Sequence, residues 1–369
     1  MCLALPALLA AVVSFGFNGP TSSASSTVHR WKVESIVVPN QFDQLTTEKS
    51  SVFLEAAVTL SGSFQGGCAP TKVDSQPLRL GAMIPGCEPG PPGERFSIKY
   101  VQVGSLHAYS NCKPESAADR VVSFDPSTRR VTTGPIIMRV SGACSHDYPV
   151  WAYAAGSLWL YNANAGPAGR SGAIAELSAS TGRLESLTYV PDMPAAVIGA
   201  DEDGFYVGPG EFYQSGQGIY HVAPGSRRAQ FLRSVPGPMA WLFGFGHSMY
   251  AGLQYDYAKP CIDHDCQLWR FEGPTATPKL VSDDVNPGDT QPVGNASVGI
   301  LITRPASPAS ASFDVVRINP ATGVTQLLAS VPVSEHGFIE STAYASGSFY
   351  VLVDEIHDEG QTRLIEVSP

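Results

Sequence analysis

The chain has 369 residues, of which 43% are hydrophobic and only 15% are charged, so it is long and apolar enough to bury a large core. Its formal net charge is −10 at pH 7, which argues against a nucleic-acid partner and against a polybasic membrane patch. The 36 glycines and 30 prolines are scattered rather than gathered in a linker, as expected where tight turns join short strands. We therefore expect a single domain over residues 28–369.

The N-terminal residues have the pattern of an export signal. Residues 3–17 are almost wholly apolar, Asn18-Gly19-Pro20 interrupts the run, and small residues follow to Thr27. The run is shorter than the roughly 20 residues that a membrane-spanning helix needs. We expect residues 1–27 to be a signal peptide and the mature chain to be secreted, without a membrane span. The alternative is an apolar N-terminal segment that packs on the mature fold.

A short phrase recurs seven times along the chain: a small polar residue or glycine, followed by an apolar and aromatic run. Successive copies lie about 50 residues apart, and a period of this length built from short strands is typical of a β-propeller with one blade per repeat. The copies begin at Ser51, Ser105, Ser157, Gly204, Ser248, Ser297 and Ser348.

Each repeat divides into four candidate strands, and the fourth repeat shows this well. Its strands are expected over residues 195–198, 205–208, 219–222 and 229–232, with a turn at Asp201-Glu202-Asp203-Gly204 between the first two. A second phrase marks the hairpin between the third and fourth strands. Its copies are variants of one Asp/Asn-Pro-x-Thr-Gly turn, in which Pro presets φ and Gly accepts a positive φ. They lie at residues 124–128, 177–182 and 318–323.

The two ends of the chain are expected to meet. The last repeat stops at its third strand, Arg363 to Val367, while the segment around Trp31, Val33 and Val37 alternates apolar and polar residues like a half-buried strand. Residues 29–38 should supply the missing outer strand and remove an open sheet edge. The sequence thus predicts an all-β, seven-bladed β-propeller with four-stranded antiparallel blades, the last blade closed by the N-terminal strand.

With these phrases, the chain resembles the secreted bacterial seven-bladed propellers of the broad YVTN, TolB-like and WD40-like group. The resemblance rests on generic blade phrases such as Asn319-Pro320-Ala321-Thr322-Gly323, and neither a recurring Trp-Asp dipeptide nor a kelch double-glycine signature is present. It implies the fold and a binding surface, and it transfers no catalytic residue.

Six cysteines besides Cys2 fall in the loops between second and third strands or in the connections between blades, which emerge on one face of a propeller. An even count suits an oxidising compartment, and although six cysteines allow fifteen pairings, the blade scheme favours three local ones. The expected disulfides are Cys68–Cys87, Cys112–Cys144 and Cys261–Cys266. A zinc site is not expected, because the last pair has no second ligand pair nearby.

The same loops hold most of the polar and aromatic clusters, and we expect the ligand to bind there. The candidate ligand-binding residues are His146, Asp147, Tyr148, Glu211, Tyr213, Asp256, Tyr257, His264, His336 and His357. Carboxylates and imidazoles could hold a divalent cation or act as a general base, whereas aromatics beside carboxylates could bind a sugar. Polar residues are also expected in the surface loops of an acidic protein, which alone would explain any single cluster.

The sequence contains no Gly-x-Ser-x-Gly elbow, no His-Glu-x-x-His pair and no phosphate-binding glycine loop. We expect a monomeric binding module for a protein or a carbohydrate ligand, with no cofactor named by any motif. The alternative is a propeller lyase or hydrolase with a carboxylate and histidine pocket on the propeller axis, with or without a metal ion.

Overall fold

The computed structural model describes residues 31–38, 42–48, 50–56, 71–75, 77–81, 100–103, 106–109, 118–125, 130–139, 150–163, 165, 171–178, 180–193, 196–210, 214, 216–235, 237–253, 266–285, 292–305, 312–334, 337–355 and 361–369. Within these residues all regular structure is β-strand, arranged in seven four-stranded antiparallel sheets. The same residues contain no helix that could span a bilayer.

The sheets follow one another along the chain, each strand pairing with the next. The first three are β2 (Phe42–Glu48), β3 (Ser51–Ala56), β4 (Thr71–Ser75) and β5 (Leu78–Leu80); β6 (Tyr100–Val103), β7 (Leu106–Tyr109), β8 (Ala118–Asp125) and β9 (Arg130–Arg139); and β10 (Val150–Ala154), β11 (Ser157–Asn162), β12 (Ser171–Ser178) and β13 (Leu184–Pro191).

The next three sheets have the same order. They are β14 (Val197–Asp201), β15 (Gly204–Gly208), β16 (Gly218–Val222) and β17 (Gln230–Ser234); β18 (Met239–Phe245), β19 (Ser248–Leu253), β20 (Cys266–Glu272) and β21 (Lys279–Val285); and β22 (Val293–Asn295), β23 (Gly299–Pro305), β24 (Ser312–Ile318) and β25 (Thr325–Pro332). The last sheet combines β26 (Gly337–Ala345), β27 (Ser348–Glu355), β28 (Gln361–Ser368) and β1 (Lys32–Val38).

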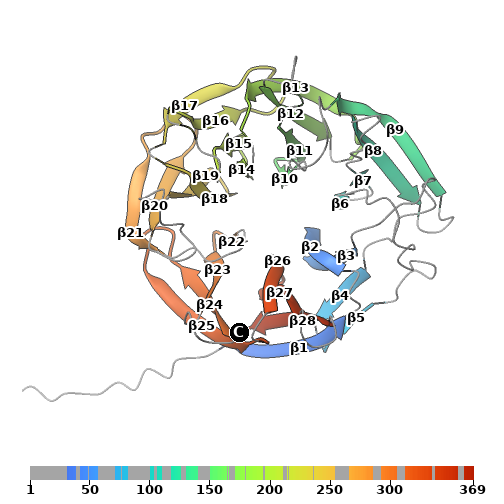
Figure 1. Cartoon of the computed structure of the whole chain (residues 1–369), viewed down its shortest axis with the longest axis vertical. Coiled ribbons are helices and arrows are strands. Elements are labelled where there is room, and N and C mark those ends of the chain that lie inside the picture. The colour runs from blue at the N-terminus through green and yellow to red at the C-terminus, as the bar shows by residue number, and fades with distance from the viewer. Residues whose placement is uncertain are drawn as a thin grey trace, which may run out of the picture.

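The seven sheets are arranged as a ring, with the first strand of each sheet nearest the centre and the fourth at the perimeter (Figure 1). The recurring phrase of the sequence forms the second strand of every sheet, from β3 to β27. The expected all-β propeller is therefore confirmed.

The sheet of β14 to β17 matches the strand order expected for the fourth repeat, with shifted boundaries. Its first strand begins later than expected and continues to Asp201, because Ala200 and Asp201 pair with Phe205 and Gly204 across a two-residue turn. A φ of +132° at Gly204 lets the chain re-enter the sheet directly after this turn.

The ring is closed by pairing between the two ends of the chain, as expected. Strand β1 lies antiparallel to β28 from Lys32 opposite Ser368 to Val38 opposite Thr362, and it forms the outer strand of the last sheet. The expected buried face of this strand is wrong, because the side chains of Val33 and Val37 are 38% and 61% exposed. Val38 packs instead, on the face that meets the β2–β5 sheet.

The hydrophobic core lies between neighbouring sheets. The Trp159 ring stacks on Phe205 with 5.7 Å between ring centroids, which joins the β10–β13 sheet to the β14–β17 sheet. Tyr350 and Leu352 of the last sheet pack with Leu45 and Val52 of the first. Burial between sheets, at roughly 25 cal/mol per Å² of apolar area, stabilises the ring as a whole.

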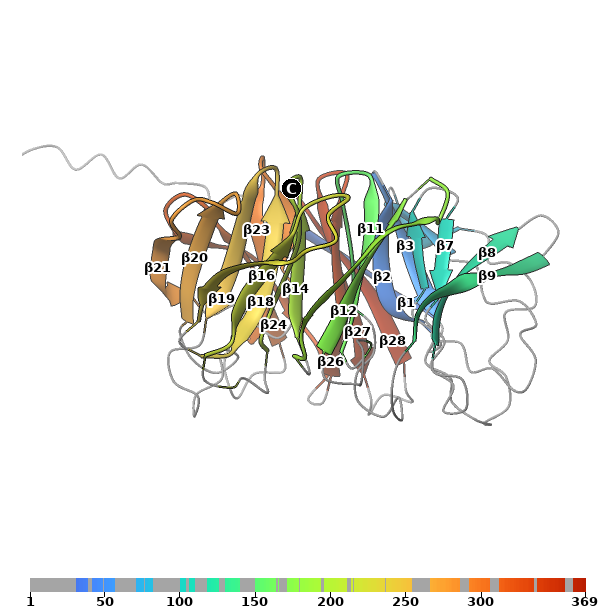
Figure 2. The same ribbon diagram turned by 90° about the horizontal axis from the view of Figure 1, so that it is seen from above.

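The two edges of the ring differ. The tight turns between first and second strands, and between third and fourth strands, lie at the upper edge in Figure 2. We call this the tight-turn edge. Antiparallel pairing then places the ends of the second strands and the starts of the third at the opposite edge, together with the ends and starts of successive sheets. We call this the connection edge.

Candidate functional site

The ten ligand-binding residues expected from the sequence lie outside the residues that the structure describes. They are His146, Asp147, Tyr148, Glu211, Tyr213, Asp256, Tyr257, His264, His336 and His357. Cys266, one of the six cysteines expected in disulfides, is the first residue of β20. The other five lie outside the described residues: Cys68, Cys87, Cys112, Cys144 and Cys261. The signal segment over residues 1–27 lies outside as well. All of these remain predictions.

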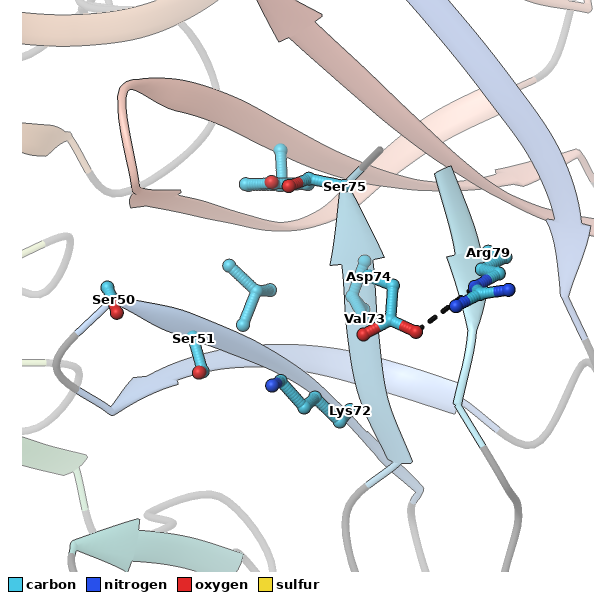
Figure 3. A pocket seen from close by; sticks show the side chains of 9 residues that line it. Ser50, Ser51, Lys72, Val73, Asp74, Ser75 and Arg79 are labelled. Atoms are coloured by element: carbon cyan, nitrogen blue, oxygen red, sulfur yellow. Dashed lines mark hydrogen bonds and ion pairs between the residues drawn. The ribbon is translucent and has the colours of Figure 1, made fainter. Parts of the chain in front are cut away.

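A polar hollow of about 360 Å³ opens where the first sheet meets the last, at the tight-turn edge (Figure 3). We call it the closure groove. Most of its wall comes from the first sheet, and the last sheet contributes one aromatic side chain. The lining residues are Ser50, Ser51, Val52, Lys72, Val73, Asp74, Ser75, Arg79 and Tyr350.

Three charged side chains of the closure groove come from two paired strands. Lys72 and Asp74 are two residues apart on β4, so they point to the same side of the sheet. Arg79 lies opposite Asp74 on β5, and its Nε donates a hydrogen bond to Asp74 Oδ2 over 3.1 Å. Figure 3 shows Asp74 between Lys72 and Arg79, with the Asp74–Arg79 contact drawn as a dashed line.

Tyr350 is held firmly at the inner side of the groove. It is 2% exposed, its phenol donates to Glu366 Oε1 over 3.3 Å, and the Ser75 hydroxyl hydrogen bonds to the phenol. Burial raises the pKa of the Tyr350 phenol, so Tyr350 stays neutral and keeps its proton for the Glu366 carboxylate. The Ser75 contact joins the first sheet to the last.

A second constellation lies at the tight-turn edge, between the innermost turns of the β14–β17 and β18–β21 sheets. His247 of one turn places Nε2 3.1 Å from Glu202 Oε2 and Nδ1 3.2 Å from Asp203 Oδ1 of the other. The Glu202 amide also donates to the Gly246 carbonyl over 3.0 Å, which fixes the two turns side by side. We call this constellation the turn cluster.

Beneath the turn cluster lie buried titratable groups. Asp201 is 3% exposed; its Oδ1 accepts the Asp203 amide over 2.8 Å, while Oδ2 has no hydrogen-bond partner among the described residues. Burial raises the pKa of Asp201 from 3.8 to about 6. The fully buried Tyr206 hydroxyl also finds no hydrogen-bond partner in the described part of the chain, and burial raises the pKa of Tyr206.

The pKa of the adjacent His221 imidazole is shifted in the opposite direction. Its ring lies 4.7 Å from the Tyr206 ring, and its Nε2 lies 2.9 Å from the Asp203 carbonyl oxygen. Burial lowers the pKa of His221, because the charged imidazolium is poorly solvated there. The described residues contain no group of three or more His, Cys, Asp and Glu side chains placed to bind a metal ion.

The sequence predicts only a turn at Asp201 to Gly204, and the candidate ligand-binding residues are expected on the opposite face. One signal for the turn cluster was available, because Glu202-Asp203 and Gly246-His247 occupy the same turn in successive repeats. The closure groove gave no such signal, since Tyr350 and Lys72 are far apart in the chain.

Comparison with known proteins supports the fold alone. No family model matches the chain, and no curated protein sequence matches it. Among solved structures, the polysaccharide lyase Uly1 is similar with a TM-score of 0.54 at 10% identity, over 92% of this chain and 99% of that chain. A structure of the mitotic checkpoint complex gives a TM-score of 0.50 at 12% identity, over 96% of this chain and 98% of that chain.

The β-propeller domain of the Trilobed protease from Pyrococcus furiosus is similar with a TM-score of 0.53 at 10% identity, over 89% of this chain and 94% of that chain. That propeller is described as having an open velcro topology. In the present chain β1 pairs with β28. All three solved structures share the propeller fold with this chain, and at identities of 10–12% the likeness shows the fold alone.

Proposed function

We propose that this protein is a secreted propeller binding module that recognises a protein or a cell-surface glycan through the loops of its connection edge. The observation that carries the proposal is the position of the flanking strand ends. Every candidate ligand-binding residue falls in a stretch that starts and finishes at this edge, such as that between Gly208 and Gly218 or that between Leu253 and Cys266.

The cysteines follow the same rule. Each expected disulfide joins segments that begin or end at the connection edge, for example between β3 and β4 and between β5 and β6 for Cys68 and Cys87. Loops that are cross-linked on a rigid ring lose less conformational entropy on binding, which favours affinity. The closed β1–β28 pairing supports the ring as a platform for such loops.

Binding of labelled protein to intact bacterial cells tests the proposal. Loss of binding after periodate treatment of the cells would identify a glycan, and loss after protease treatment would identify a protein. Tyr257→Ala and His264→Ala should weaken binding, while His247→Ala at the tight-turn edge should leave it unchanged. If only His247→Ala weakens binding, the recognition surface lies on the other edge and the proposal is wrong.

A propeller enzyme is the second candidate. The buried carboxyl of Asp201 beneath the turn cluster favours it, because a carboxyl with a pKa of about 6 near the His247 imidazole is suited to acid–base chemistry. The similar fold of a polysaccharide lyase makes polysaccharides the first substrates to test. Release of unsaturated or reducing ends from acidic polysaccharides, abolished by Asp201→Asn in a folded variant, would support an enzyme; no release would support the binding module.

A further inference from the structure

We infer that the closure groove is a second binding site, for a small hydroxylated anion with the chemistry of an acidic sugar unit. The groove lies at the tight-turn edge, so this site is separate from the loops on which the proposed function depends. Charge, hydrogen-bonding groups and volume each point to this class of ligand.

The charge of the groove is opposite to that of the molecule. Among the described residues that line the groove, the charged ones are Lys72, Arg79 and Asp74, which together carry a formal charge of +1 in a chain of net charge −10. The Arg79 guanidinium neutralises Asp74, and within the described part of the chain the exposed Lys72 ammonium has no carboxylate partner. Lys72 can therefore pair with an anion at little desolvation cost.

The remaining polar lining suits ligand hydroxyl groups. Ser50, Ser51 and Ser75 contribute hydroxyls that both donate and accept, and Arg79 uses only Nε for Asp74, leaving its other N–H groups for a ligand. A volume of about 360 Å³ lies near the lower end of the roughly 300–1,000 Å³ typical of small-molecule sites. One or two sugar rings would fill it, whereas an apolar ligand would find few apolar partners.

The position of the groove couples binding to closure of the ring. Tyr350 lines the groove and hydrogen bonds to Glu366 of β28, the strand that pairs with β1. A ligand in the groove would lie beside the contact between Ser75 and Tyr350, which joins the first sheet to the last. Since it binds the folded ring, it should raise the melting temperature.

The test uses glucuronate, with glucose as its neutral counterpart and sulfate as an anion without a ring. Calorimetric titration and thermal melts at low salt should show that glucuronate binds more tightly than either. Lys72→Gln should weaken glucuronate binding roughly tenfold, because it removes a charge-assisted hydrogen bond. The matched control is Lys279→Gln on β21, another exposed lysine, which should leave binding unchanged.

Failure of glucuronate to bind at millimolar concentration, or equal loss in both lysine variants, would overturn the inference. If sulfate binds as tightly as glucuronate, the groove recognises a simple anion, and the inference that its ligand is a sugar is wrong. Lys72 is exposed, so its variant should fold, and circular dichroism would verify this. Cell binding through the connection edge does not depend on Lys72, so either proposal can fail without the other.

Discussion

Tyr350 on β27 lies directly opposite Glu366 on β28, and its phenol donates to the Glu366 carboxylate over 3.3 Å. The same pairing of a large second-strand side chain with a charged or imidazole third-strand side chain recurs around the ring. Further examples are Trp159 with Glu176, Tyr206 with His221 and Tyr250 with Arg270. Glu176, His221 and Glu366 are shielded from water, so these groups must find partners within the protein, whereas the Arg270 side chain is 31% exposed.

Glu176 is the position of this type with the most complete set of partners, and its replacement should be costly. It is 1% exposed and accepts the Ser157 and Ser186 hydroxyls, each over 2.9 Å, and the Gly225 amide of the next sheet over 2.7 Å. Glu176→Gln replaces one of the two acceptor oxygens by an NH2 group, so at least one of the three donors must turn to accept instead or lose its hydrogen bond. We expect the free energy of unfolding to fall by roughly 1–3 kcal/mol in urea titrations.

Glu185→Gln is the matched control for this change. Glu185 is exposed on β13, the strand after that of Glu176, so its replacement should change the free energy of unfolding by less than roughly 0.5 kcal/mol. Equal stability of Glu176→Gln and the wild type would mean that the three hydrogen bonds contribute nothing to the fold.

Gly252 should not tolerate a side chain. It pairs with Trp241 across β18 and β19, and a Cβ at Gly252 would lie 2.7 Å from Cε2 of the buried Trp241 ring. Gly252→Ala should lower the free energy of unfolding by roughly 1–3 kcal/mol through overpacking. At Gly347 a Cβ meets nothing within 4 Å, and only its φ of +88° opposes alanine. Thermal melts in which Gly347→Ala costs more than Gly252→Ala would refute the steric argument.

The expected disulfides can be identified by mass spectrometry of unreduced proteolytic fragments. Linked peptides should contain Cys68 with Cys87, Cys112 with Cys144 and Cys261 with Cys266. Reduction should lower the melting temperature, because each cross-link lowers the entropy of the unfolded chain and so stabilises the fold by a few kcal/mol. Any linkage between different pairs, or free thiols throughout, would contradict the assignment.

The fold could be predicted from the sequence because its signals are local and repeated. The phrase that begins at Ser157 or Ser348 repeats in every blade, and Gly182 and Gly323 adopt φ values of +67° and +72° at the exits of the expected hairpin turns. Their amides donate to Ser178 and Asn319 carbonyls over 2.7 and 2.8 Å. These interactions depend on a few neighbouring residues, so the sequence is enough.

The groups at the tight-turn edge could not be found in this way, because they depend on contacts between blades. The sequence gives no indication that Lys72 and Tyr350 line one hollow. It shows that Glu202 and His247 occupy the same turn of successive repeats, but their contact depends on how the two blades pack. The prediction of which face of β1 is buried was wrong for the same reason. Alternation predicted a half-buried strand, but which half is buried depends on the neighbouring sheet.

Removal of the closing strand should destabilise the ring. Deletion of residues 29–38 takes away the pairing from Lys32 to Val38 and exposes the edge of β28. We expect the melting temperature to fall by at least roughly 5 °C. Val37→Ser, at a side chain that is 61% exposed, is the control and should melt like the wild type. An unchanged melt after the deletion would show that β1 does not close the ring.

The last prediction concerns Asp201 and pH. Its pKa is about 6 in the folded protein against an ordinary 3.8, because burial disfavours the carboxylate. Between these values the folded state binds more protons than the unfolded state, so stability falls as pH rises. The contribution of this group is fully present below about pH 3.8 and is lost as the pH passes about 6. A shift of this size corresponds to at most roughly 3 kcal/mol.

Asp201→Asn removes this titration and keeps an acceptor for the Asp203 amide. The free energy of unfolding of the wild type, minus that of the variant, should therefore decrease from about pH 4 to about pH 7 in urea titrations. His221 has a lowered pKa and adds a dependence of opposite sign, but it is present in both proteins and cancels in the difference. A difference for Asp201→Asn that does not vary with pH would mean that the Asp201 carboxyl is solvated in the folded protein.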